Sequence, residues 1–211
     1  MKDLILVGSG AFGLEVFSWI ESAVGFNKQF KLKGFLDSKT ISFGDSHFCD
    51  VQILGSPSEY EIKPNDVFVC TIGNPTVKKM VVEELQNRGA KFINIIHNSI
   101  IEFKNITYGV GIIVSPYCVI SNNAILHSHV SINLFCSIGH DAVIGRYSVL
   151  SSHCDITGGV VLGEEILAGS GVKVIPRVSV IDRTVLGAGS IIMRSIKKAG
   201  TYVGNPAMKL L

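Results

Sequence analysis

The chain has 211 residues, of which 47% are hydrophobic and 17% are charged, a composition that excludes intrinsic disorder. Its formal net charge of +2 gives no reason to expect a nucleic acid or an anionic membrane as a partner. No apolar run approaches the roughly 18 residues of a membrane-spanning helix, so we expect no membrane association.

The first part of the chain alternates short apolar runs with helical patterns. We expect strands at 4–7, 31–37, 66–72 and 92–96, and helices at 11–22 and 76–88. Residues 8–13 form a glycine-rich turn between the first strand and the first helix. This alternation predicts an α/β domain with a small parallel sheet, equivalent to half of a Rossmann fold.

Charge density falls sharply along the chain. Residues 1–109 contain 23 Asp, Glu, Lys and Arg, whereas residues 110–193 contain 9. This shift predicts a domain boundary, and we divide the chain into an α/β domain at 1–95 and a second domain at 96–211.

A six-residue repeat dominates the second domain. Every sixth position from Val114 to Ile192 is aliphatic or alanine, fourteen positions without a break. A second register, two residues earlier, runs from Ile112 to Ser190 and contains only small or aliphatic side chains. Two inward residues and a corner make one face of a prism, and three such six-residue faces close one coil. The repeat therefore predicts a parallel β-helix of about 4.7 coils.

The cysteines are odd in number and form no CxxC pair, so we expect reduced thiols in a cytoplasmic protein. Three of them follow one another at intervals of one full coil and should stack inside the prism as small fillers. The five are Cys49, Cys70, Cys118, Cys136 and Cys154.

Several motifs resemble the PglD/NeuD-type sugar acetyltransferases of the hexapeptide-repeat family. They are the glycine-rich start at 7–16, Phe-Leu-Asp at 35–37, Thr-Ile-Gly-Asn at 71–74, Ser-Ile-Gly-His-Asp at 137–141 and Val-Gly-Asn-Pro-Ala at 203–207. The resemblance implies a left-handed β-helix, a homotrimer with sites between neighbouring β-helices, and acetyl transfer from acetyl-CoA. The expected acceptor is the amino group of a nucleotide-linked amino sugar.

His140 is the best candidate for the general base. It follows the corner residue Gly139, so its side chain can leave the core, and Asp141 can hold the imidazole in one tautomer. Gly158 lies one coil later and should stack directly on His140. The resemblance implies that the Gly158 amide binds the acetyl carbonyl.

The loop before the first helix suits a phosphate, and the small domain fits a mononucleotide attached to a sugar better than a dinucleotide. We expect Asp37 and Ser38 beside the nucleoside, and the resemblance places a sugar contact at Asn133. The predicted substrate-binding residues are Gly10, Ala11, Phe12, Asp37, Ser38, Gly73, Asn74 and Asn133.

Two stacked glycine-rich corners, 169–171 and 187–189, leave a shallow groove in which the resemblance places the pantetheine arm of acetyl-CoA. The predicted donor contacts are Gly158, Ser170, Gly171 and Ala188, and Lys197, Lys198 and Lys209 are candidates for the CoA phosphates. The sequence departs from the family twice: Phe12 and Val149 stand where histidines are usual.

Three alternatives stay open at this point. The first is an O-acetyltransferase of the sialic-acid type, in which His140 deprotonates a hydroxyl group. The second is a zinc lyase of the γ-carbonic anhydrase type, but His127, His129, His140 and His153 lack the required five-residue spacing, so we expect no metal. The third is a non-catalytic nucleotide-sugar binding protein, which an intact His140 and Gly158 argue against.

Overall fold

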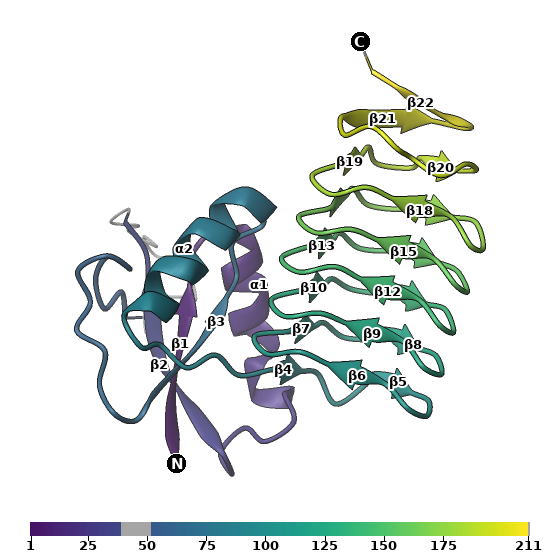
Figure 1. Ribbon diagram of the computed structural model, residues 1–211. Helices are drawn as coiled ribbons and strands as arrows, with labels where there is room; N and C mark the ends of the chain where they lie inside the picture. Colours follow the sequence, from purple (N-terminus) through teal and green to yellow (C-terminus); the bar gives the residue numbers. More distant parts are fainter. Residues whose placement is uncertain (39–51, 211) are drawn as a thin grey trace.

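A small parallel sheet and a long stack of coils lie side by side in the computed structural model, which describes residues 1–38 and 52–210 (Figure 1). In the sheet, β1 (Lys2–Val7) lies between β2 (Phe30–Leu36) and β3 (Asp66–Cys70), and both neighbours pair with it in parallel. All of β3 is buried, because both faces of the sheet are covered.

Two helices cover the two faces of this sheet. Helix α1 (Ala11–Trp19), continued by the 3₁₀ turn η1 (Ile20–Ser22), packs with Leu4 and Leu6 on one face. Helix α2 (Pro75–Asn87) packs on the other, where Val82 and Leu85 meet Ile5. The parallel sheet and both helices therefore confirm the α/β domain that the sequence predicts.

The second part is a parallel β-solenoid with three faces. The first face contains β4 (Ile95–Ile96), β7 (Ile113–Val114), β10 (Ser131–Ile132), β13 (Val149–Leu150), β16 (Leu167–Ala168), β19 (Val185–Leu186), β21 (Thr201–Gly204) and β22 (Ala207–Lys209). The second face contains β5 (Ile101–Glu102), β8 (Val119–Ile120), β11 (Ser137–Ile138), β14 (Asp155–Ile156), β17 (Lys173–Val174) and β20 (Ile191–Ile192). The third face contains β6 (Thr107–Tyr108), β9 (Ile125–Leu126), β12 (Val143–Ile144), β15 (Val161–Leu162) and β18 (Ser179–Val180).

The predicted hexad registers are confirmed as the interior of the prism. All fourteen positions from Val114 to Ile192 are at most 2% exposed, and the earlier register from Ile112 to Ser190 is at most 5% exposed. Each strand pairs with the strand one coil further along the chain, as Ser131 with Val149 shows. Two inward side chains per face thus fill the prism, and each coil supplies the backbone partners of the next.

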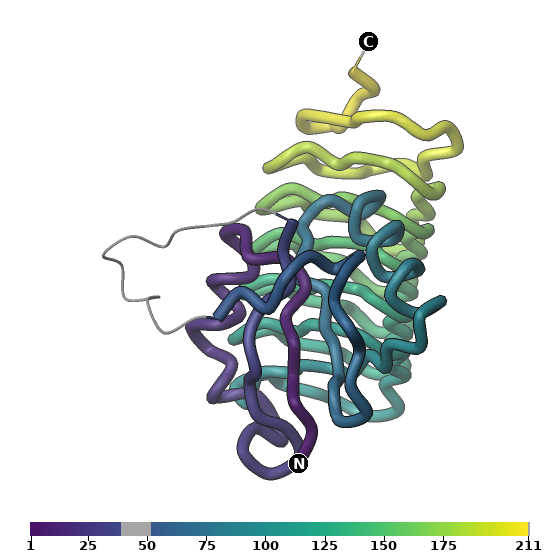
Figure 2. The backbone as a smooth tube through the Cα atoms, turned by 90° about the vertical axis from the view of Figure 1, so that its left-hand side faces the viewer, coloured from purple at the N-terminus to yellow at the C-terminus, as the bar shows by residue number. Residues whose placement is uncertain are grey.

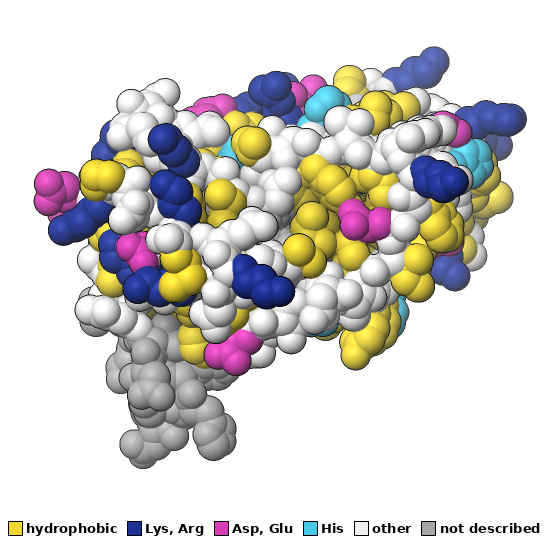
Figure 3. Space-filling model, turned by 90° about the horizontal axis from the view of Figure 1, so that it is seen from below, with side chains coloured by type: hydrophobic (Ala, Val, Ile, Leu, Met, Phe, Trp, Pro, Cys, Tyr) yellow, Lys and Arg dark blue, Asp and Glu magenta, His cyan; other side chains and the backbone are white. Residues whose placement is uncertain are grey.

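The solenoid is longer than the sequence analysis predicts. It has about six turns rather than 4.7, because the first coil begins at Ile95, before the unbroken aliphatic repeat. The strand expected at 92–96 in the small sheet is therefore wrong. Only an isolated bridge from Phe92 to Phe68 reaches that sheet, while Ile95 and Ile96 pair with β7. Hydrophobic side chains gather at this lower end of the molecule (Figure 3).

Each corner of the prism has one residue in the left-handed region. These residues recur every six positions from Asn105 to Gly189, with φ between 55° and 73°. Asn, Asp and Gly tolerate this conformation best, and four of these corners are glycine. We call the corner after the first face the first corner, that after the second face the second corner, and that after the third face the third corner.

The α/β domain covers the first face and the third corner of the solenoid. Ile95 and Ile113 of the first face belong to the same hydrophobic cluster as Leu4 and Val16. Nζ of Lys78 in α2 donates to the carbonyl of His129 at the third corner, at 3.2 Å, and to Oγ of Ser131 at the start of β10, at 2.6 Å. Figure 2 shows the sheet and both helices in front of the stacked coils. The second corner, opposite the first face, is therefore directed away from this domain.

Four buried cysteines carry free thiols, namely Cys70, Cys118, Cys136 and Cys154, and Cys49 lies outside the described residues. The column inside the prism is more than a filler. Sγ of Cys136 donates to the carbonyl of Ser151 at 3.1 Å, and Cys118 and Cys154 make equivalent bonds. Each thiol thus satisfies a carbonyl group at the first corner of the next coil.

Candidate active site

The imidazole of His140 lies on the second corner, between β11 and β12. Its Nδ1 is 2.7 Å from Oδ2 of Asp141, and both side chains are more than half exposed in the single chain. Asp141 occupies the left-handed corner position, with φ of 58°. Because Nδ1 faces a carboxylate, the proton lies on Nδ1 and Nε2 keeps its lone pair. Nε2 is therefore the atom available to accept a proton from a substrate.

Gly158 stacks on this imidazole, as its position one coil later predicts. A Cβ atom on Gly158 would lie 2.4 Å from Nε2 of His140, closer than any real Cβ contact. In the part of the chain that the structure describes, no acceptor bonds the Gly158 amide. The corner thus brings together a basic nitrogen and an unpaired backbone donor, with only hydrogen atoms between the glycine and the ring.

Asp141 has a second partner, which the sequence analysis missed. Nδ2 of Asn123, one coil earlier, donates to Oδ1 of Asp141 at 3.0 Å. Asn105, one coil before that, donates to Oδ1 of Asn123 at 3.3 Å. The bonds from His140 and then Asn123 hold the pKa of Asp141 below its usual range. The regular spacing of Asn105, Asn123 and Asp141, one coil apart, is a signal that the sequence contains.

Most of the predicted nucleotide-binding residues meet at one edge of the small sheet. Gly10 and Ala11 follow β1, Asp37 and Ser38 follow β2, and Gly73 follows β3. Because the strands are parallel, all of these residues lie at their carboxyl ends. This is the edge at which ligands bind in open α/β sheets, and Gly10, Ala11, Ser38 and Gly73 are exposed there.

The structure also gives two of these residues local roles. Oδ2 of Asp37 accepts from the amide of Ser9 at 2.8 Å and from its hydroxyl at 2.7 Å, so Asp37 holds the glycine-rich loop. Oδ1 of Asn74 accepts from the amide of Val77 and caps α2. Gly13 allows the loop to fold back, since a Cβ there would lie 2.1 Å from the carbonyl oxygen of Gly8.

The loop leads directly into α1 and leaves the start of that helix without a side-chain cap. Gly10 is the N-cap residue, and its carbonyl accepts from the amide of Leu14 at 3.0 Å. Exposed amides at a helix start suit a phosphate group. Phe12, where the family usually has a histidine, is half-buried and packs on the cluster of α1, so it offers no polar group to a ligand.

The remaining predicted contacts lie on the first corner, one full face away from His140. Asn133 follows β10, and its Oδ1 accepts from the amide of Leu134 at 2.7 Å. Ser170 and Ala188, both exposed, lie further along the solenoid on this same corner, and Gly171 takes its left-handed position. A single chain therefore does not bring Asn133 and the donor groove to His140.

Val149, the second departure from the family, is 7% exposed in β13. This strand is on the first face, between Ser131 of β10 and Leu167 of β16. The side chain supplies no polar atom to either corner. The second histidine of the family therefore has no substitute at this position.

A large cavity lies at the C-terminal end of the solenoid. It has a volume of about 610 Å³ and is bounded by the end of β20 and by the β21–β22 hairpin. Arg194, Lys197 and Lys198 line it together with Tyr202 and Met208. Three cations beside apolar and aromatic groups suit a phosphorylated nucleotide such as the adenosine end of CoA.

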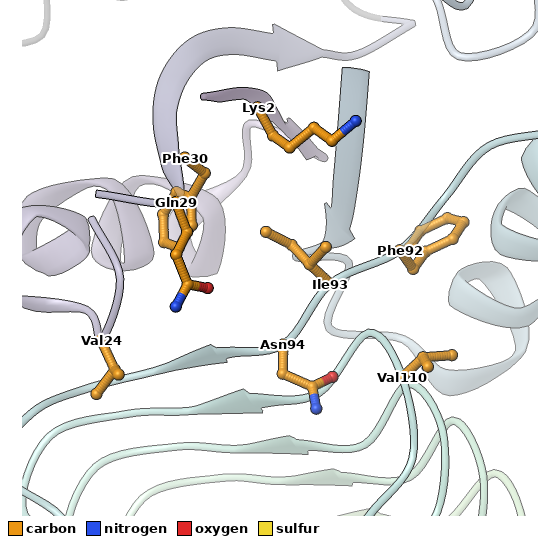
Figure 4. Close-up of a pocket in the computed structure, with 8 residues that line it drawn as sticks. All are labelled: Lys2, Val24, Gln29, Phe30, Phe92, Ile93, Asn94 and Val110. Atoms are coloured by element: carbon orange, nitrogen blue, oxygen red, sulfur yellow. The ribbon is translucent and has the colours of Figure 1, made fainter. Parts of the chain in front are cut away.

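A second cavity, of about 340 Å³, lies beside the small sheet, at the end opposite the predicted nucleotide-binding edge (Figure 4). Lys2, Phe30 and Ile93 line it, and Asn94 borders it from the start of the solenoid. The side-chain amide of Asn94 is already bonded to Gly109 and Ile112. Because this cavity is at the amino ends of the strands, it is separate from the edge that carries the predicted nucleotide site.

Among residues 1–38 and 52–210, no group of three His, Cys, Asp or Glu side chains could hold a metal ion. In the same residues, no helix has the length and apolarity needed to cross a bilayer.

The chain thus joins an α/β domain with a nucleotide-type edge to a parallel β-solenoid that carries a histidine at an exposed corner. Residues 3–85 match the family model described as the PglD N-terminal domain. This match confirms the resemblance that the sequence motifs indicate for the first part of the chain.

Solved structures extend the likeness of fold to the whole chain. The acetyltransferase domain of PglB from Neisseria gonorrhoeae is 23% identical, with a TM-score of 0.88 and 100% of both chains covered. PerB from Caulobacter crescentus, in complex with CoA and GDP-perosamine, is 21% identical with a TM-score of 0.86, covering 100% of this chain and 98% of PerB. WeeI from Acinetobacter baumannii is 18% identical, with a TM-score of 0.85 and full coverage of both chains.

Proposed function

We propose that the protein is an acetyl-CoA-dependent N-acetyltransferase that acts on the amino group of a nucleotide-linked amino sugar. The observation that carries this proposal is the second corner, where Nε2 of His140 lies beside Gly158, whose amide has no acceptor among the described residues. The fold supports it, since PglB has been solved with acetyl coenzyme A and PerB with CoA and GDP-perosamine.

In this reaction the acceptor nitrogen attacks the thioester carbonyl and forms a tetrahedral oxyanion. Nε2 of His140 takes the proton that the nitrogen loses, while Asp141 stabilises the resulting imidazolium. The Gly158 amide donates to the oxyanion. When the C–S bond breaks, the imidazolium returns the proton to the CoA thiolate, so that the products are the acetylated sugar and CoA.

The transfer is direct, with no acetyl-enzyme. The nearest thiols belong to Cys136 and Cys154, both 1% exposed inside the prism and bonded to backbone carbonyls. Both side chains point into the packed interior of the prism, so neither sulfur can reach a thioester bound at the exposed corner. A thiol buried in apolar surroundings is inert as a nucleophile.

Each active site forms between two chains of a homotrimer. His140 lies on the second corner, whereas Asn133 and the groove at Ser170, Gly171 and Ala188 lie on the first corner. Placing the second corner of one chain against the first corner of its neighbour brings the two groups together, and three such contacts close a ring. The exposed aromatic residues Tyr117 and Phe135 on the first corner would be covered in this assembly.

Donor and acceptor then bind at different parts of the molecule. The basic cavity at Arg194, Lys197 and Lys198 holds the CoA phosphates. The strand-end edge at Gly10, Asp37 and Gly73 holds the nucleotide. Acetyl-CoA and nucleotide sugars are cytoplasmic metabolites, so we place the reaction in the cytoplasm.

The test is incubation of the purified chain with acetyl-CoA and a panel of UDP-, dTDP-, GDP- and CMP-linked sugars, followed by mass detection. The proposal expects an acetylated product, heavier by about 42 Da, only from sugars that carry a free amine. Acetylation confined to sugars that carry hydroxyl groups alone would instead show an O-acetyltransferase. The absence of product from every sugar, with acetyl-CoA unconsumed, would contradict the proposed function.

A further inference from the structure

The second corner holds a column of polar side chains that extends beyond the His140–Asp141 pair. Asn105, Asn123 and Asp141 occupy the same left-handed position in three successive coils, with φ of 59°, 59° and 58°. Their identical backbone conformations direct the three side chains the same way. A bond of 3.3 Å joins Asn105 to Asn123, and one of 3.0 Å joins Asn123 to Asp141.

The direction of these bonds fixes the position of the carboxylate. The Asn123 amide donates to Oδ1 of Asp141, which leaves Oδ2 for Nδ1 of His140. Without Asn123, nothing else among the described side chains bonds Oδ1, and the carboxylate of this exposed residue can turn about its Cβ–Cγ bond. Asp141 could then swing away from the imidazole.

We propose that Asn123 is a positioning residue, which orients Asp141 and through it the tautomer and direction of the His140 ring. The expected effect on the reaction rate rests on the proposed function. The orientation of Asp141 and His140 by Asn123 does not, because it follows from the hydrogen bonds of the corner alone. Asn123 touches neither substrate nor donor in this account, since it lies one coil below the imidazole on the side away from Gly158.

The orientation of Asp141 by this column is not explained by nearby charges. Neither asparagine titrates, and the hydrogen bonds from His140 and Asn123 are the main reasons why the pKa of Asp141 lies below its usual range. The cations on this corner that are nearest in the coil order, Lys104 beside Asn105 and Arg177 against Gly159, each lie two coils from Asp141, one on either side of it. The contribution of Asn123 is therefore that of a hydrogen-bond donor in a fixed place.

The corner allows a substitution that removes the side chain and keeps the backbone. Glycine already occupies the left-handed position at Gly159 in this same column, so Asn123→Gly adds no strain. Asn105→Gly is the matched control, with the same residue type, the same φ and a place one coil further from His140. Asn123→Asp keeps the shape of the side chain and replaces the donor with a second carboxylate.

The experiment measures two quantities for wild type and the three variants. The first is the tautomer of His140, from its ring nitrogen and carbon NMR shifts, which needs no turnover. The second is kcat, together with KM for the nucleotide-linked amino sugar that accepts the acetyl group. We expect Asn123→Gly to mix the tautomers and lower kcat about ten-fold with little change in KM. This loss is smaller than the roughly 10²-fold that a misplacement of about 1 Å can cost, because some of the molecules keep the productive ring. Asn105→Gly should have a much smaller effect on both, because Asn105 reaches Asp141 only through Asn123.

Asn123→Asp separates donation from packing. If only the volume of the side chain mattered, Asn123→Asp would have the wild-type kcat. The proposal instead expects Asn123→Asp to be as slow as Asn123→Gly. A wild-type tautomer in Asn123→Gly, or an equal loss of kcat in Asn105→Gly, would overturn the positioning role. If the wild-type chain acetylates no sugar, the proposed function fails, and the tautomer measurement still decides the role of Asn123.

Discussion

Nε2 of His140 and the α-carbon of Gly158 lie so close that a Cβ atom on the glycine would be 2.4 Å from the nitrogen. Real Cβ atoms essentially never come within 3.0 Å of another heavy atom, so any other residue at 158 must displace the ring. The ring can move, because the His140 side chain is 67% exposed in the single chain. Movement would break its contact with Asp141.

We therefore expect Gly158→Ala to fold and to lose activity. The φ of Gly158 is not in the left-handed region, so alanine adds no backbone strain there. The melting temperature should change little, whereas kcat should fall by roughly 10²-fold, since both the base and the oxyanion donor are disturbed. A variant with wild-type kcat would show that the Gly158 corner is not where the thioester binds.

Mixed assemblies test whether the site is shared between chains. His140→Ala and Asn133→Ala alter different corners, so each should be poorly active alone. Refolded together, they should recover about one quarter of wild-type activity, because random mixing pairs an intact His140 with an intact Asn133 at that fraction of interfaces. His140→Ala mixed with Gly158→Ala is the control, since these two residues share one corner and no recovery is expected. Absence of recovery in the first mixture would place both groups in one chain.

The hexads show how much of the fold the sequence predicts. Inward positions such as Ile138 and Cys136 can be identified from the sequence, because the buried interior of the prism admits only small or aliphatic side chains. The first coil is less regular, with Ile101 and Phe103 exposed, so the sequence pattern becomes recognisable only one coil later. The left-handed corners also escaped it, because Tyr117, Phe135 and Arg177 occupy a conformation that residue type alone does not indicate.

His129 links the two domains and should make the protein sensitive to acid. It is 2% exposed, and its ring stacks on Tyr147 with 5.3 Å between centroids. Burial, then the positive charges of Lys78 and Arg146, lower its pKa to about 4. The folded state therefore binds this proton less readily than the unfolded state, in which the pKa is 6.5.

Stability should consequently be complete above about pH 6.5 and should be lost as the pH falls from there to about 4. The loss amounts to about 3 kcal/mol, at about 1.4 kcal/mol for each pH unit. Urea unfolding of wild type and His129→Asn across this range is the measurement, and the variant should show a flatter dependence. Parallel curves for the two proteins would show that His129 does not carry the effect.

Lys78 predicts a second dependence, in the alkaline pH range. It is 1% exposed, and its Nζ donates to Ser131 and to the carbonyl of His129. Burial lowers its pKa to about 8 from 10.5. Between these two values the unfolded state binds more protons, so the free energy of unfolding should rise with pH from about 8 to 10.5.

Lys78→Met keeps the length of the side chain and removes the ionisable group. The difference in unfolding free energy between wild type and this variant should therefore change by about 3 kcal/mol between pH 8 and 10.5. Denaturant titrations at four or five pH values within that range measure it, and the difference cancels the other groups that titrate there. A constant difference would mean that Lys78 is charged throughout.

The sequence identifies the residues of the candidate site better than it identifies their positions relative to one another. His140, Asp141 and Gly158 meet as their spacing requires, since His140 and Gly158 are one coil apart. Asn133 is only seven residues before His140, yet the second face of the prism separates them. Residues that are close in the sequence can lie on different corners of one coil. The role of Asp37 in holding Ser9 depends on a long-range contact that no local pattern encodes.

We propose His140 as the general base of a direct acetyl transfer. The most direct test is the rate of a single turnover with acetyl-CoA already bound, compared between wild type, His140→Ala and His127→Ala. His127, an exposed histidine at the third corner, is the matched control and should leave the rate unchanged. The account predicts a decrease of about 10²–10⁴-fold for His140→Ala, with a smaller change in KM. A His140→Ala rate close to wild type, or acetyl groups accumulating on a cysteine before the sugar is added, would contradict it.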